Sequence, residues 1–149
     1  MIMRKLLLVV ALCLGALLPA HAQKGLQIDN LFSGKLVDMS MVSESIVSGK
    51  KLVPYNLDYF RSVRFMADEK QVSKVTKWIR EDAQMAEEQD MESENGRLVY
   101  ALLKFPRRME KNRYVGYQIK RISGKDYVTV VYMEGAAIVE DLKVIFKHR

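Results

Sequence analysis

Ser48-Gly49-Lys50-Lys51 is the segment whose residue types come nearest to catalytic chemistry. Serine acyl enzymes use a Ser-x-x-Lys spacing, which places a lysine one helical turn after the nucleophilic serine. Here the segment spans a glycine turn, and neither a Ser-Asp-Asn nor a Lys-Thr-Gly motif follows it. A plain turn is therefore the favoured interpretation. A small secreted hydrolase that uses this Ser-Lys pair or carboxylates is the alternative function.

The other reactive side chains are few and poorly spaced for catalysis. The 149 residues include one cysteine, Cys13, and two histidines, His21 and His148. A frayed carboxyl terminus cannot hold the His148 imidazole in a catalytic triad, and a zinc site of the usual kind needs more Cys and His ligands. The acidic run 87–94 lacks the ligand alternation and central glycine of a calcium loop. The sequence therefore predicts no catalytic residue, no metal and no cofactor.

Residues 1–22 have the pattern of a secretory signal peptide. The basic pair Arg4-Lys5 precedes an apolar run from Leu6 to Leu18, and Ala20-His21-Ala22 matches a small-x-small cleavage site. The run is shorter than the roughly 20 apolar residues of a membrane-spanning helix. We expect cleavage near Ala22, export to the periplasm or the cell exterior, and no transmembrane segment after cleavage.

Residues 23–149 have the length and apolar content of one domain with a single core. The net charge of the full chain is +6, a modest excess. Because an exported protein seldom meets nucleic acid, we expect no nucleic-acid partner and interpret the excess as solubility or attraction to anionic envelope components. The expected partners are an envelope protein, a peptide or an anionic glycan.

Two groups of side chains are candidate binding sites. The first is a basic segment between two expected strands, formed by Lys104, Arg107, Arg108, Lys111 and Arg113. Loops on rigid sheets often carry recognition, so the segment is a candidate binding loop for an anionic partner, and a polar hairpin loop is its alternative. The second is a candidate aromatic surface formed by Tyr55, Tyr59 and Tyr114, for which cross-strand packing is the alternative.

The elements that would position these side chains begin with a long helix, predicted from Glu69 to about Glu92. Asp68 and Gln71 form a capping box at its start. Apolar residues recur along it at steps of three and four and form the packing stripe: Val72, Val75, Ile79, Ala83 and Ala86. A final helix is predicted from about Ala137 to Lys147.

The rest of the pattern predicts strands and one helical turn. Strand patterns cover residues 41–47, 51–53, 62–66, 98–105, 115–120 and 127–133, and residues 57–60 resemble one helical turn. Short connections favour antiparallel pairing. The predicted fold is α+β, with an antiparallel sheet of four to five strands and both helices packed on one face. Residues 98–105 are apolar on both faces, so we expect a partner, or a homodimer, to cover the second face.

The sequence resembles a group of small exported bacterial proteins of unknown function, of the gut-anaerobe type. The similarity rests on short segments spread along the chain: 23–26, 49–52, Pro54-Tyr55, 60–62, Asn112-Arg113-Tyr114 and 132–135. The resemblance implies a bacterial envelope protein and carries no activity, ligand or catalytic residue. Together with the scarcity of reactive side chains, it favours a non-catalytic binding or interaction module.

Overall fold

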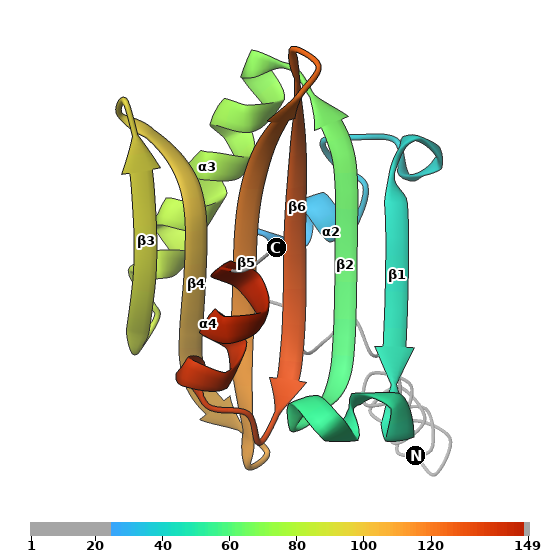
Figure 1. The fold of residues 1–149 in the computed structure, drawn as a ribbon, viewed down its shortest axis with the longest axis vertical. Coiled ribbons are helices and arrows are strands. Elements are labelled where there is room, and N and C mark those ends of the chain that lie inside the picture. Colours follow the sequence, from blue (N-terminus) through green and yellow to red (C-terminus); the bar gives the residue numbers. More distant parts are fainter. Residues whose placement is uncertain (1–24, 148–149) are drawn as a thin grey trace, which may run out of the picture.

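The structure of the protein is a computed structural model that describes residues 25–147 (Figure 1). The predicted signal peptide, with Cys13 and His21, lies outside the described residues, and so does His148. No helix within residues 25–147 is both long enough and apolar enough to cross a membrane.

A six-stranded antiparallel sheet forms the centre of the fold (Figure 1). Its strands are β1 (Ser43–Ser48), β2 (Leu57–Ala67), β3 (Glu88–Glu94), β4 (Arg97–Arg108), β5 (Lys111–Ile122) and β6 (Lys125–Gly135). They lie side by side in the order β1-β2-β6-β5-β4-β3. The predicted α+β class with an antiparallel sheet is confirmed, and the sheet has six strands where four to five were predicted.

The last four strands form a meander, because each pairs with the next through a short hairpin. β2 then adds to the free side of β6, and β1 adds to β2 as the outer strand. Two-residue turns with positive φ close the hairpins, at Asn95-Gly96, Met109-Glu110 and Ser123-Gly124. This left-handed turn geometry matches the right-handed twist of the paired strands.

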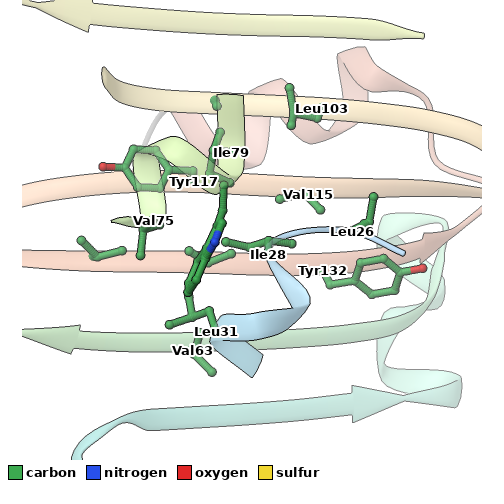
Figure 2. Close-up of a cluster of buried hydrophobic side chains, with 14 of the residues drawn as sticks. Leu26, Ile28, Leu31, Val63, Val75, Ile79, Leu103, Val115, Tyr117 and Tyr132 are labelled. Carbon is green, nitrogen blue, oxygen red and sulfur yellow. The ribbon is translucent and has the colours of Figure 1, made fainter. Parts of the chain in front are cut away.

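The helix α3 (Glu69–Ala83) covers one face of the sheet, here named the α3 face. Asp68 caps it as predicted, since its carboxylate accepts the Gln71 backbone N–H at 2.8 Å while the Gln71 side chain accepts the Asp68 N–H. The buried stripe of the helix packs with α2 (Asp29–Phe32) and with the inward residues of the strands, as Figure 2 shows around Ile79 and Ile28. This cluster is the larger of the two cores.

The prediction that α3 continues to about Glu92 is wrong. The helix ends at Ala83, and residues Glu88–Glu94 form the edge strand β3 instead. β3 pairs with β4 from Glu88 opposite Lys104 to Glu94 opposite Arg97. It carries four carboxylates in seven residues, and it is the outer strand on its side of the sheet.

The helix α4 (Val139–Lys147) covers part of the opposite face, here named the α4 face (Figure 1). Val139 and Leu142 pack there with Tyr100 and Leu102 of β4. The prediction that both helices pack on one face is therefore wrong. The expectation that β4 needs a second molecule on its other face is wrong too, because α4 of the same chain covers that face.

Two short segments also differ from the prediction. Residues 51–53, predicted as a strand, belong to the 3-10 helix η3 (Gly49–Tyr55), which contains Pro54. Residues 57–60, predicted as a helical turn, begin β2. Asn56 separates the two in a left-handed conformation with φ of 56°, which ends η3 and redirects the chain into the sheet. A second 3-10 helix, η2 (Met39–Met41), precedes β1.

Candidate functional site

A groove of about 660 Å³ lies on the α4 face, on the part of the sheet that α4 leaves uncovered. Its floor comes from β2, β6 and β5, and its two walls come from η3 and from the end of α4. Ligand sites in proteins have volumes of roughly 300–1,000 Å³, so the groove has the size of a small-molecule site.

One end of the groove is apolar, because apolar side chains of neighbouring strands stand in one row. Phe60 of β2 lies opposite Val47 of β1 on one side and opposite Met133 of β6 on the other. Leu52 of η3 and Leu57 at the start of β2 extend this apolar surface. The lining of this end therefore combines three consecutive segments, β1, η3 and the start of β2, with the distant strand β6.

Gly116 explains how the end of α4 comes close enough to the sheet to form a wall. The Phe146 ring lies over this glycine, and a Cβ added to Gly116 would be 3.2 Å from the ring tip. A glycine inside a strand often marks such a close approach. Ile145 and Phe146 thereby face the groove from α4.

The other end of the groove is polar and cationic. Thr129 of β6 lies between Arg64 of β2 and Gln118 of β5, each being its register partner. One step further along, Lys120 lies opposite Tyr127. The Arg64 guanidinium is 5.2 Å from the centre of the Tyr127 ring, which positions the cation at this end through a cation–π contact.

The charge of the groove has one sign. Its charged lining residues within the described chain are Lys51, Arg64 and Lys120, and no carboxylate lines it. None of these three cations forms an ion pair with another described residue. The groove therefore combines an apolar floor with positive charge that no carboxylate of residues 25–147 pairs with.

Hydrogen bonds at Ala137 connect the two walls of the groove to each other and to β5. The Ala137 N–H donates to the Asn56 carbonyl at 2.7 Å, which joins the start of α4 to the end of η3. The Ala137 carbonyl in turn accepts from the Tyr114 hydroxyl and from the Asn112 side-chain amide. Burial raises the pKa of Tyr114 to about 12, so this phenol stays a donor at physiological pH.

The basic residues singled out from the sequence lie on the hairpin of β4 and β5, and two of them form ion pairs. The set is Lys104, Arg107, Arg108, Lys111 and Arg113. The Lys104 ammonium is 2.9 Å from the Glu87 carboxylate, and the Lys111 ammonium is 3.2 Å from that of Asp58. These two cations therefore brace the hairpin against neighbouring segments.

Two arginines of the same hairpin bond to backbone carbonyls of the hairpin itself. Arg107 donates to the Glu110 carbonyl at 2.6 Å, and Arg113 donates twice to the Pro106 carbonyl at 3.1 Å. The Arg113 guanidinium also lies 6.0 Å from the centre of the Phe105 ring. The structure thus gives these side chains partners within the hairpin, and binding of an anionic partner here stays a prediction.

The three tyrosines of the predicted aromatic surface do not form one surface. Tyr55 at the end of η3 is exposed and borders the groove. Tyr59 packs on the α3 face, where its ring meets the edge of Tyr132 with centroids 6.2 Å apart. Tyr114 is fully buried on the α4 face, so its assignment to an exposed surface is wrong. The Tyr114 side chain is buried because its position on β5 faces the core under α4.

The segments considered for catalysis and metal binding are not assembled into a site. No hydrogen bond joins Ser48 to Lys51 in the described part of the chain. The acidic run lies along β3 rather than around a loop. Within residues 25–147, no group of three or more His, Cys, Asp and Glu side chains is placed to hold a metal ion.

The cationic end of the groove was missed by the reasoning from sequence. The alternation of Val63 and Phe65 with Arg64 is visible in the sequence, and it puts Arg64 on the strand face opposite to those two residues. Nothing in that alternation shows that Lys120 and Tyr127 stand beside it. Their proximity depends on β2 pairing with β6, which is a contact between distant segments.

The fold and its groove define an α+β protein with a six-stranded antiparallel sheet and a cationic, apolar-floored site on one face. The chain belongs to a family of unknown function, DUF6108, whose model matches residues 16–146. This match confirms the expected membership of a family without assigned activity. No curated protein and no solved structure matches the chain significantly.

Proposed function

We propose that this protein is a non-catalytic binding module of the bacterial envelope, exported after cleavage near Ala22, and that its ligand site is the groove on the α4 face. The observation that carries the proposal is the groove itself, a preformed hollow of about 660 Å³ with an apolar floor and a few polar groups at one end. This is the usual composition of a ligand site.

Exposed apolar side chains at the margins of the groove support the same proposal. Tyr55 at one end and Ile122 at the other are each 46% exposed. Scattered apolar residues on a surface need no explanation, but apolar residues around an apolar hollow favour binding. A ligand that filled the groove would remove both side chains from water.

The composition of the groove does not favour the hydrolase alternative. Hydrolysis by carboxylates needs two of them facing one substrate, and no carboxylate of the described chain lines the groove. Hydrolysis by the Ser-Lys pair needs the lysine to accept the serine proton, and no hydrogen bond joins Ser48 to Lys51. Ligand binding can use both the apolar floor and the cations of the groove. The two hydrolytic reactions lack the carboxylate pair or the Ser48–Lys51 hydrogen bond that they need.

The shape of the site favours a small molecule over the broader partners expected from sequence. A flat protein interface would need a larger surface than one groove, about 800 Å² on each partner. A glycan site would need the tyrosines to gather, and Tyr59 and Tyr114 are turned into the two cores. An apolar peptide segment is the macromolecular ligand that would also fit the groove.

A neutral fluorescent probe tests the proposal directly. N-phenyl-1-naphthylamine, which brightens in apolar sites, should bind the purified protein saturably and with one-to-one stoichiometry. Thr129→Trp places a large ring on the groove floor and should weaken probe binding by about tenfold or more, since the ring occupies the volume that the probe needs to reach its apolar contacts. Ser73→Trp adds the same ring to the exposed side of α3 and should leave binding unchanged.

Two results would contradict the proposed site. Probe binding that Thr129→Trp and Ser73→Trp weaken equally would show that the groove is not where the probe binds. An absence of saturable binding to a folded protein would show that the groove accepts no apolar ligand. Circular dichroism and thermal unfolding of both variants confirm that each one is folded.

A further inference from the structure

We infer that the ligand of this groove is a single-chain fatty-acid anion, with its carboxylate at the Arg64 and Lys120 end and its alkyl chain along the floor toward Phe60 and Met133. This inference rests on the proposed function and adds the chemical class and the orientation of the ligand. The argument uses the charge of the groove, its length and the arrangement of its polar groups.

The charge of the ligand follows from the charged side chains that line the groove, which are all cations. Several cations outside the groove pair with carboxylates of the same chain, among them Arg61 with Glu44 at 3.0 Å and Arg97 with Asp126 at 2.8 Å. Among the described residues, the groove cations Lys51, Arg64 and Lys120 have no such partner, and no carboxylate lines the groove. An anion would supply the missing counter-charge, whereas a cationic ligand would be repelled.

The chain of the ligand follows from the distance between the two ends. Phe60 and Arg64 are four residues apart on β2 and point to the same face, which separates them by about 13 Å along the strand. Apolar lining continues over this distance through Val131 and Phe146. A ligand that satisfies both ends is therefore elongated, with an apolar part and one charged end.

The polar groups beside Arg64 favour a carboxylate bound at that end of the groove. The Arg64 guanidinium presents paired donors that match the two oxygens of a carboxylate. Gln118 and Thr129, in the same cross-strand row, add an amide and a hydroxyl that donate hydrogen bonds. Lys51 is exposed on η3, beside Leu52 of the apolar end, and so belongs to the other end of the groove.

Competition with the neutral probe measures the head-group preference. Decanoate, 1-decanol and decyltrimethylammonium have the same alkyl chain and differ in charge, and each is titrated below its micelle concentration at about pH 8, where the carboxylate is ionised. Decanoate should displace the probe at a concentration about tenfold or more below that of decanol, as expected for charge-assisted hydrogen bonds. The decyl cation should be the weakest competitor.

Two charge variants locate the carboxylate. The double variant R64Q/K120Q should reduce the preference for decanoate over decanol to about twofold or less, since it removes both charges of that end. Lys51→Gln should keep the preference, and so should K35Q/K70Q, a matched double variant that removes two exposed cations outside the groove. All of these variants should still bind the neutral probe.

An alkanoate series tests the position of the chain. From octanoate to decanoate to dodecanoate, affinity should rise by about threefold to fourfold for each added methylene, as long as the added carbon is buried. In the variant Phe60→Ala this dependence should become weaker, while the preference for decanoate over decanol persists. This combination separates contacts of the chain from contacts of the head group.

Each outcome bears on one of the two proposals. If the probe does not bind, the proposed function fails and the ligand class fails with it. If the probe binds but decanoate and decanol compete equally, the proposed function stands and the fatty-acid anion is overturned. If Lys51→Gln rather than R64Q/K120Q removes the preference, the proposed orientation is overturned. If an apolar peptide competes and no alkanoate does, the ligand is of the peptide class instead.

Discussion

The carboxylate of Asp82 on α3 accepts the backbone N–H of Ile28 at 2.9 Å, across 54 residues of sequence. Its other oxygen accepts the N–H of Gln27 at 2.7 Å. Asp82 is fully buried, and burial raises the pKa of its carboxyl although the two N–H donors oppose that effect. This one side chain therefore holds the segment that leads into α2 against the α3 face, where Leu26 and Ile28 complete the core.

Replacing Asp82 should destabilise the protein, because the backbone N–H groups of Gln27 and Ile28 would lose an acceptor. Asp82→Asn keeps one acceptor and turns an NH₂ group toward the other N–H, which should lower the free energy of unfolding by about 1–3 kcal/mol. Urea unfolding measures the change. Glu81→Gln is the control, because its exposed pair with Lys77, at 3.9 Å, should contribute about 0.5 kcal/mol or less. Equal effects of the two variants would contradict the assigned role.

Gly135 should not tolerate a side chain. A Cβ at this position would lie 2.6 Å from both the Asn56 carbonyl oxygen and the Leu57 Cα, which are backbone atoms that cannot rotate away. Gly135→Ala should lower the free energy of unfolding by about 3 kcal/mol or more, measured by urea unfolding. Gly116→Ala meets only the tip of the Phe146 ring and should cost about 1 kcal/mol. A reversed order of the two losses would contradict this difference.

Stability should fall in alkali through two buried phenols. Burial raises the pKa of Tyr100 and of Tyr114 from 10.0 to about 12 in the folded protein. As pH rises through this window, the folded chain binds more protons than the unfolded chain, so the free energy of unfolding decreases. The double variant Y100F/Y114F should show a flatter dependence between these pH values in urea unfolding. Parallel pH dependences of wild type and variant would refute the assignment.

Substitutions in the turn between β4 and β5 should stabilise the protein. Met109 and Glu110 both have positive φ, at 51° and 65°, which costs side-chain-bearing residues free energy. The equivalent turn between β3 and β4 uses Asn95-Gly96, the preferred pair for this geometry. M109N/E110G should therefore raise the free energy of unfolding by about 1 kcal/mol, seen as a higher thermal midpoint. The reciprocal exchange N95M/G96E should lower it by a similar amount, and an unchanged midpoint in both would contradict the prediction.

The start of α3 was predictable from sequence, whereas its end was not. The capping box of Asp68 and Gln71 is a local signal, and the structure reproduces it atom by atom. The following acidic residues suit a helix by intrinsic propensity, and they become β3 because β4 offers a pairing edge with Lys104 opposite Glu88. Tertiary pairing overrides local propensity at that point.

The placement of α4 illustrates a second limit of the sequence pattern. Leu142 and Ile145 show which side of the helix is apolar, and nothing in the spacing shows which face of the sheet that side covers. The face follows from the connection at Ala137, which is bonded to Asn56 and Tyr114. The groove depends on the same long-range contacts, so its apolar members were visible as core residues but not as a site.

The acidic residues of β3 affect whether another strand can add to this edge of the sheet. An outer strand presents unpaired backbone groups to which another strand can add, and natural proteins guard such edges with charge. Glu88, Asp90, Glu92 and Glu94 place like charges along this edge, so a second copy that approached β3 strand to strand would be repelled. The carboxylates of β3 thereby oppose edge-to-edge addition of another sheet on that side.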